Sequence, residues 1–290
     1  MSVAPAAPSP AARPPFALSA SGAPAQEARR PAAARARAGP ACVAVLVRDG
    51  KRDQVAPLLP PGARAVGSVE ELLAAGPDLV ADCAGHEALR LYAEPLLRAG
   101  ASLVTVSSGA LAAPALEARL AAAQARPGGG RLLIASGAML GLDGLAAARY
   151  GGLERVRYRG IKPARAWRGT PAEALLDLDG RAEPAEFFRG SAREAASQYP
   201  ANANVTATIA LAGIGFDRTE VCLVADPAGR ENIHQLEYAG AFGRAQVEVR
   251  GRPSPANPKT SLLTGLSVWR ALCEETLASL PLMAPRTLVQ

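Results

Sequence analysis

The chain has 290 residues, of which 49% are apolar, and a formal net charge of +6. This length allows one large domain or two ordinary ones, and the lack of any run of about eighteen uncharged apolar residues argues against a membrane span. Five arginines and one glutamate in residues 1–40 account for +4 of the charge, so the nearly neutral remainder argues against a nucleic-acid partner. Four widely spaced cysteines without a CxxC pair argue against a metal site and fit a reduced, cytoplasmic protein.

The first segment, residues 1–40, contains fifteen alanines and eight prolines and shows no apolar periodicity. Prolines at this density interrupt helices and strands, so we expect the segment to be disordered. Its arginines and serines, with a single acidic residue, are also typical of a mitochondrial transit peptide.

From residue 42 onward, short apolar runs alternate with helical patterns. Ser68, followed by Glu71 three residues later, is typical of a helix N-terminus. Buried strands that alternate with helices predict a doubly wound α/β domain with a parallel sheet over residues 41–135. The predicted strands are 42–47, 64–66, 78–82, 102–106 and 131–135, and the predicted helices are 68–75, 86–98 and 112–125.

The pattern changes in the second half of the chain, where residues 136–257 predict an α+β domain with an antiparallel sheet. Strands are expected at 155–162 and within 219–250, with helices at 191–199 and 203–213. Asn257 and Pro258 are typical of a helix N-cap and first turn. The final segment, residues 258–290, is therefore expected to form a helix that packs against the first domain.

Three turns of small residues follow predicted strands: "DCAGH" (82–86), "SSGA" (107–110) and "SGA" (136–138). Ligands of doubly wound sheets bind beyond the carboxyl ends of the strands, where small residues let a cofactor approach the backbone. Tight turns use Gly and Ser in any case, but three such turns favour a ligand groove. His86 fits a surface histidine at a helix start and stays outside the predicted catalytic set. The groove candidates are Ala84, Gly85, Ser108 and Gly109.

Residue types that are scarce in this chain gather in its second half. The chain, which is rich in Ala, Arg, Gly and Pro, has three lysines, two histidines and four asparagines, and most of them fall between residues 162 and 259. In "ENIHQLEYAG", Asn232 and His234 share one face of a predicted strand because the side-chain period of a strand is two. A histidine suits proton transfer near neutral pH, although a strand histidine can equally be structural.

Two basic segments could bind anions. In "NPKTS", Lys259 and Thr260 would lie in the first turn of the last helix, where free backbone amides favour negative charge. In "IKPARAWRGTPAE", Lys162 and Arg168 could hold carboxylates. A solvated lysine and an ordinary basic loop are the alternative interpretations.

Several segments together resemble the NAD(P)-dependent L-aspartate dehydrogenases. They are "SGAMLGLDGL", "KPARAWRGTPAE", "FFRGSAREAASQYPANANVTATIALAGIGFDRTEV", "ADPAGRENIHQLEYAGAFG" and "NPKTS", and the similarity runs from about residue 42 to the C-terminus. The resemblance implies a Rossmann-like domain and oxidation of L-aspartate to iminoaspartate, which hydrolyses to oxaloacetate and ammonia or feeds NAD biosynthesis. It also implies a homodimer or a larger homo-oligomer.

The same resemblance assigns roles to individual residues. It places the active-site histidine at His234 and cofactor contacts at Ala138 and Asn204. The cofactor would supply the redox chemistry, and His234 could take a proton from the substrate amine. Lys162, Arg168 and Lys259 are candidates for binding the two substrate carboxylates.

The sequence departs from the family pattern at its beginning. Family members open with a strand and a G-x-G-x-x-G-type turn, but here the Ala/Pro/Arg segment occupies that place, and we interpret the first strand and the glycine-rich loop as missing or degenerate. "CVAVLVRDG" (42–50) then reads as the second strand of the domain. Its end carries both Arg48, which suits the 2′-phosphate of NADP, and Asp49, which suits NAD.

Three functions remain open at this stage. The chain is an active L-aspartate dehydrogenase, an inactive or cofactor-impaired relative, or an oxidoreductase of another small amino or keto acid. Cofactor titration separates the first two, and turnover of L-aspartate, L-glutamate and L-alanine separates the third.

Overall fold

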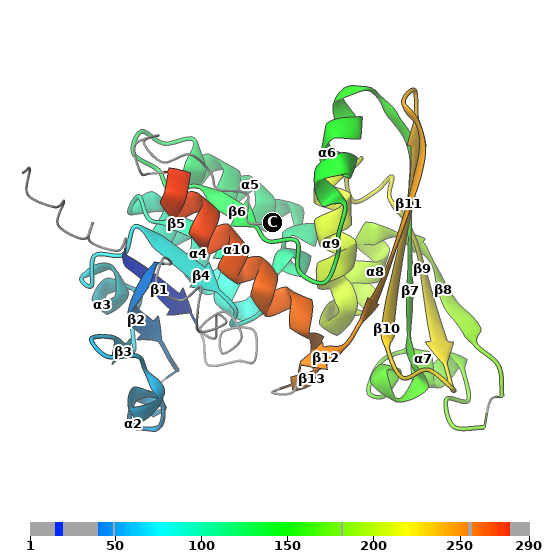
Figure 1. Ribbon diagram of the computed structural model, residues 1–290, viewed down its shortest axis with the longest axis horizontal. Coiled ribbons are helices and arrows are strands. Elements are labelled where there is room, and N and C mark those ends of the chain that lie inside the picture. Colours follow the sequence, from blue (N-terminus) through cyan, green and yellow to red (C-terminus); the bar gives the residue numbers. More distant parts are fainter. Residues whose placement is uncertain (1–14, 20–39, 49, 181, 255–256, 279–290) are drawn as a thin grey trace, which may run out of the picture.

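The computed structural model describes residues 15–19, 40–48, 50–180, 182–254 and 257–278. Two β-sheets lie in separate halves of the molecule, and helices fill the space between them (Figure 1). The long C-terminal helix α10 (Leu262–Ala278) crosses the first sheet and joins the second half through a short strand pair.

The first sheet has six parallel strands in the order β3-β2-β1-β4-β5-β6. This order is the one found in doubly wound dinucleotide-binding folds, so the predicted fold class is confirmed for this half. The strands are β1 (Pro15–Ser19), β2 (Ala41–Leu46), β3 (Arg64–Val66), β4 (Leu79–Asp82), β5 (Ser102–Thr105) and β6 (Leu132–Ile134).

Strand β1 corrects the expectation that the opening strand is missing and that residues 1–40 are disordered throughout. It lies in the centre of the sheet and pairs in parallel with both β2 and β4, and Ala17 is fully buried. A four-residue apolar stretch is hard to recognise inside an Ala/Pro-rich segment, and pairing with a neighbour on each side supplies the stability that composition does not indicate. The expected place of the glycine-rich turn, after Ser19, lies outside the described residues.

Helices cover both faces of this sheet because alternate side chains of each strand point to opposite sides. On one face, Val80 and Leu103 pack with the apolar sides of α3, α4 and α5. On the other face, Val104 packs with Val268 and Leu272 of α10, which confirms that the last helix returns to the first domain. The helices of this half are α2 (Arg52–Val55), η1 (Ala56–Leu58), α3 (Val69–Leu73), α4 (His86–Arg98), η2 (Ser108–Ala112) and α5 (Pro114–Gln124). Ser68 caps α3 by accepting a hydrogen bond from the Glu71 N–H, as predicted.

The second sheet is mixed, with the order β11-β10-β7-β9-β8. The prediction of an antiparallel sheet is wrong for one pair, because β7 and β9 run parallel. The alternating pattern of a strand is the same in both orientations. Strand β8 lies between β7 and β9 in the sequence and runs antiparallel to β9, so it returns the chain to the end of the sheet where β7 began. The strands are β7 (Leu153–Pro163), β8 (Ala185–Ser191), β9 (Glu220–Asp226), β10 (Asn232–Gly240) and β11 (Gly243–Gly251).

Helices α6, α8 and α9 lie on the face of the second sheet that is turned toward the first domain (Figure 1). Helix α9 contacts η2 of the first domain, so it forms part of the junction between the two halves. The helices of this half are α6 (Leu142–Tyr150), η3 (Ala164–Trp167), α7 (Ala172–Leu175), α8 (Ala192–Gln198), η4 (Pro200–Asn202) and α9 (Ala203–Ala212).

The segment before the last helix differs from the prediction. Residues Asn257–Ser261 form strand β13, which pairs with β12 (Pro253–Ser254), instead of the first helical turn. Helix α10 begins at Leu262, and the hydroxyl of Ser261 accepts a hydrogen bond from the Leu263 N–H. Ser261 therefore plays the capping part that the sequence suggested for Asn257. In the described part of the chain, every helix is too short or too polar to span a membrane.

Candidate active site

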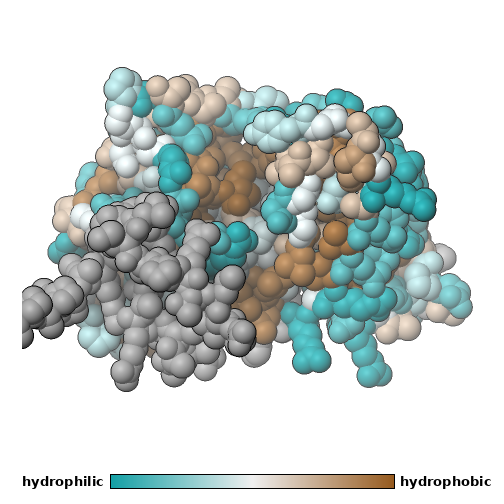
Figure 2. Space-filling view, turned by 45° about the horizontal axis from the view of Figure 1, so that its top comes forward, coloured by the Kyte–Doolittle hydropathy of each residue, from teal (hydrophilic) through white to brown (hydrophobic). Residues whose placement is uncertain are grey.

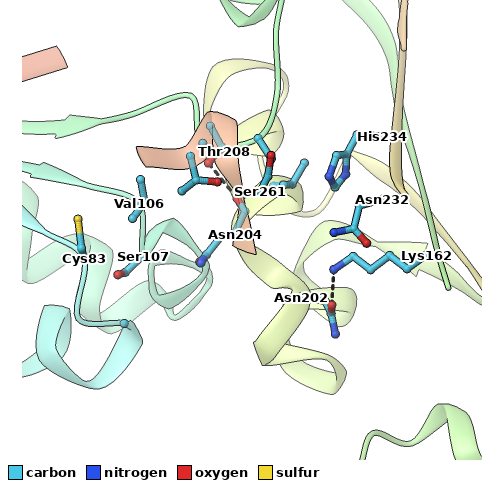
Figure 3. Close-up of a pocket in the computed structure, with 15 residues that line it drawn as sticks. Cys83, Val106, Ser107, Lys162, Asn202, Asn204, Thr208, Asn232, His234 and Ser261 are labelled. Atoms are coloured by element: carbon cyan, nitrogen blue, oxygen red, sulfur yellow. Dashed lines mark hydrogen bonds between the residues drawn. The ribbon is translucent and has the colours of Figure 1, made fainter. Parts of the chain in front are cut away.

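A pocket lies where the carboxyl ends of β4, β5 and β6 meet α9 and the second sheet (Figure 3). The first domain contributes Cys83, Gly85, Val106, Ser107, Gly137 and Ala138 to its lining. The second domain contributes Lys162, Asn202, Asn204, Val205, Thr208, Asn232 and His234, and the chain before and within α10 contributes Ser261 and Thr264. None of these lining residues is acidic, so the pocket suits an anionic ligand.

The cofactor side of the pocket is formed by the turns that follow the strands. Gly85 has φ +103°, and a Cβ added to it would meet nothing within 4 Å, so its backbone faces open space. It precedes α4, a thirteen-residue helix whose N-terminus has no side-chain cap. The free amides of such a helix end attract a negatively charged or polar ligand.

A buried carboxylate supports this side. Asp82, at the end of β4, accepts hydrogen bonds from the Thr105 hydroxyl at 2.7 Å and from the Ala84 N–H at 3.0 Å. Burial raises the pKa of this carboxyl group, and the hydrogen bonds from Ser107, Thr105 and Ala84 oppose that effect. Because Asp82 joins β4, β5 and the following turn, it fixes the shape of the pocket wall.

His234 extends from β10 into the pocket, as the two-residue period predicted, and Asn232 lies beside it (Figure 3). The His234 side chain is only 3% exposed, and its Nδ1 lies 2.8 Å from the Tyr158 hydroxyl. Burial lowers the pKa of the imidazole to about 3, with a further contribution from the charge of Lys162. His234 is therefore neutral at physiological pH, and Tyr158 orients its ring.

Lys162 reaches the pocket from β7, next to His234 (Figure 3). Its amine donates a hydrogen bond to the Asn202 side-chain oxygen and lies 5.4 Å from the centre of the Trp167 ring. Desolvation lowers the pKa of the amine to about 8. Within the described residues, no carboxylate forms an ion pair with this amine, so its charge is available to a ligand.

Several predicted site residues lie elsewhere. Ser108 and Gly109 do not line the pocket: both are buried against α9, where they form hydrogen bonds with Asn204. Ala84 is exposed behind the turn. Arg168 is exposed and forms an ion pair with Asp179, away from the pocket.

The remaining predicted residues concern the adenosine end and the last helix. Arg48 is exposed after β2, the strand that the strand order confirms as the second of the domain. Asp49 lies outside the described residues. Lys259 and Thr260 belong to β13 and not to the helix, and the placement of their side chains is also outside the description.

Six polar residues of the pocket were not among the predicted site residues: Ser107, Asn202, Thr208, Asn232, Ser261 and Thr264. Ser107 immediately precedes the predicted Ser108, and Asn202 lies two residues before Asn204, so both belonged to segments that the sequence had marked. Ser261 and Thr264 were hidden by the assumption that the last helix begins at residue 258. Moving that helix start by four residues brings different hydroxyl groups to the pocket.

The strand order, the open helix end and a histidine with a lysine from the second domain define a two-domain dehydrogenase that uses a nicotinamide dinucleotide. Residues 27–134 match the family described as homoserine dehydrogenase, NAD binding domain, and residues 143–274 match the family described as aspartate dehydrogenase, C-terminal. The chain is 52% identical over 224 residues to an L-aspartate dehydrogenase of Cupriavidus necator, a match that covers 77% of this chain and 82% of the relative. It is 54% identical over 196 residues to an L-aspartate dehydrogenase of Pseudomonas aeruginosa, covering 68% and 73% of the two chains. The chain belongs to the L-aspartate dehydrogenase family.

Solved structures share the fold. The crystal structure of aspartate dehydrogenase from Thermotoga maritima matches with a TM-score of 0.67 at 21% identity, and the match covers 94% of this chain and 99% of that one. A hyperthermophilic archaeal homoserine dehydrogenase in complex with NADPH matches with a TM-score of 0.55 at 12% identity, covering 93% and 99%. These matches support the arrangement of the two domains described above.

Proposed function

We propose that this chain oxidises L-aspartate to iminoaspartate with NAD or NADP, and that iminoaspartate then hydrolyses to oxaloacetate and ammonia. The observation that carries the proposal is one pocket that joins the two domains. In it, the strand ends of the first domain face His234 and Lys162, and among the described residues the Lys162 amine has no carboxylate partner. Family membership at about half identity supports the same substrate.

The residues of the first domain fit a nicotinamide dinucleotide. Gly85 leaves room for close approach to the backbone, and Ala138 and Ser107 present small side chains at neighbouring strand ends. Asn204 approaches the same space from α9 (Figure 3). When bound, the nicotinamide ring supplies the redox chemistry by accepting a hydride from the substrate Cα.

His234 serves the proton transfers of the reaction. The substrate amine must be unprotonated before its Cα gives up hydride, and later a water molecule must lose a proton as it attacks the imine. A neutral imidazole can accept a proton through Nε2 when Nδ1 donates its hydrogen to Tyr158. The low pKa of His234 means that burial disfavours its charged form, so a proton taken from the substrate does not stay on the imidazole.

Lys162 binds a substrate carboxylate. Among the described residues its amine has one hydrogen-bond partner, Asn202, and two hydrogens remain for an anion. Asn202 and Asn232, on either side, can donate amide hydrogens to the same ligand. Arg168 has no part in this arrangement because it is exposed and paired with Asp179.

The wider assignments belong to the same proposal. We propose a cytoplasmic homodimer, or a larger homo-oligomer, whose product enters NAD biosynthesis. We propose that the enzyme accepts either NAD or NADP. The exposed guanidinium of Arg48, just after β2, can pair with the 2′-phosphate of NADP and also leaves room for the free ribose hydroxyl of NAD.

The test combines cofactor binding with turnover. Fluorescence titration with NADH and NADPH should give saturable binding, and L-aspartate should be oxidised with a far higher kcat/KM than L-glutamate or L-alanine. His234→Ala should lower kcat by about 100-fold or more with little change in cofactor affinity. Gln235→Ala, one residue along β10 on the opposite face, is the matched control and should keep wild-type turnover.

Each alternative has its own result. Absence of binding up to millimolar cofactor would identify an inactive relative. Preference for another amino acid would move the substrate assignment to that compound. Undiminished turnover of the His234→Ala variant would remove this residue from the mechanism.

A further inference from the structure

Asn204 is held by two groups of the first domain although it belongs to the second. Its side-chain oxygen, Oδ1, lies 3.0 Å from the backbone nitrogen of Gly109 and 2.7 Å from Nε2 of His86. Gly109 belongs to η2 and His86 opens α4. Both contacts therefore cross the junction between the two domains, next to the pocket.

These two contacts fix which way the amide of Asn204 faces. A backbone N–H can only donate, so the atom that faces Gly109 must be the amide oxygen. His86 shares that oxygen, so its Nε2 must carry a hydrogen as well. The Asn204 nitrogen, Nδ2, then points into the pocket toward Ser107 (Figure 3), where it offers hydrogens to a ligand.

The surroundings are shaped for this contact. A Cβ added to Gly109 would lie 2.6 Å from Nε2 of His86 and 2.9 Å from Cβ of Ala203, so a larger residue would displace the imidazole or the helix. The Asn204 carbonyl accepts hydrogen bonds from Ser108 at 2.9 Å and from Thr208 at 2.8 Å. The backbone and the side chain of Asn204 are thus both fixed before any ligand binds.

We propose that His86 is a positioning residue: its Nε2–H orients the amide of Asn204 so that Nδ2 donates to an acceptor oxygen of the bound dinucleotide. The inference rests on the proposed function for the identity of that ligand. Without the His86 donor, the amide loses one of the two contacts that hold its oxygen away from the pocket. Rotation of the Asn204 amide about its Cβ–Cγ bond would then turn Oδ1, an acceptor, toward the acceptor oxygen of the ligand.

The experiment measures the dissociation constants of NADH and NADPH by fluorescence for wild type, His86→Leu and His86→Gln. His86→Leu should weaken binding about 5- to 10-fold, the effect of one net hydrogen bond. His86→Gln, whose amide nitrogen can replace Nε2–H, should recover most of the affinity. Glu87→Gln, at the exposed neighbouring position of α4, is the matched control and should bind as the wild type does.

Two further variants test whether His86 acts through Asn204. In the Asn204→Ala background, His86→Leu should add no further loss, because the group that it orients is absent. Asn204→Asp keeps an oxygen for His86 and Gly109 but replaces the donor with a second acceptor. It should weaken binding more than His86→Leu does, and it supplies the test if His86→Leu fails to fold.

Three results would overturn the proposal: wild-type affinity of His86→Leu, equal losses for His86→Gln and His86→Leu, or additive losses in the double variant. The wild type could bind dinucleotide, and the His86 variants could change its affinity as expected, while L-aspartate is not turned over. That result would remove the substrate assignment and leave this inference in place. A wild-type chain that binds neither dinucleotide would overturn both.

Discussion

Replacing Lys162 with methionine should make the protein more stable at pH 7 and less active. Burial lowers the pKa of this amine from 10.5 to about 8, which shows that holding its charge in the pocket costs folding free energy. A difference of about 2.5 in pKa corresponds to at most ~3 kcal/mol. Partial exposure of Lys162 to solvent reduces this figure, and methionine also loses the contacts with Asn202 and Trp167. We therefore expect a net gain of about 1–2 kcal/mol.

The dependence on pH identifies the cause. Between pH 8 and pH 10.5 the unfolded chain holds a proton on Lys162 that the folded chain has released, so the wild type gains stability as pH rises through this window. The Lys162→Met variant lacks this gain, and its advantage should shrink by up to about 1.4 kcal/mol per pH unit. Urea unfolding of both proteins at pH 7 and pH 9.5 measures the change.

The control is Lys51→Met, because Lys51 is an exposed lysine whose amine contacts only Gln54 among the described residues. This variant should stay within about 0.5 kcal/mol of the wild type at both pH values. In kinetic assays, Lys162→Met should lower kcat/KM for L-aspartate about 10- to 100-fold, the effect of a lost charged hydrogen bond. A destabilised Lys162→Met variant at pH 7, or a stability difference that does not change with pH, would refute the reasoning.

Three other substitutions should give distinct results. Tyr158→Phe removes the hydroxyl that orients His234, so kcat should fall about 10-fold while cofactor affinity stays constant; an unchanged kcat in steady-state assays would count against that role. Arg168→Ala should leave kcat/KM within about twofold, because this side chain is exposed and paired with Asp179; a larger fall would restore it to the site. Leu272→Ala should lower the free energy of unfolding in urea by about 2–4 kcal/mol, since the side chain is fully buried under the first sheet.

Most of the first sheet could be predicted because its strands are continuous apolar runs between turn residues. The predicted ranges 64–66 and 78–82 differ from β3 and β4 by at most one residue at either end. Strand β1 was missed for a physical reason: its stability comes from pairing with β2 and β4, which lie 22 or more residues away in sequence. The composition of residues 15–19 and their neighbours therefore does not indicate that pairing.

The start of the last helix shows how two local signals compete. Asn257 with Pro258 and Ser261 with Leu262 are both acceptable N-termini, and sequence alone favoured the first pair. The pairing of β13 with β12 decides for the second, because residues that belong to a strand ladder cannot also form a helical turn. The consequence is functional, since Ser261 now lines the pocket.

The scarcity of certain residue types located the site better than any single turn did. The composition of this chain favours Ala, Arg, Gly and Pro, and most of its few amide, amine and imidazole side chains lie close together, although Lys51 is an ordinary exposed lysine. Five such residues line one pocket: Lys162, Asn202, Asn204, Asn232 and His234.

The same reasoning should have included His86, the second histidine of the chain. Its partner Asn204 is 118 residues away, and only the packing of α9 against the first domain brings the two within 2.7 Å. Residue type therefore indicates that a group has a specific function. The contact between the domains decides which partner the residue has. In this chain that partner is the Asn204 amide, so His86 orients an amide and does not transfer a proton.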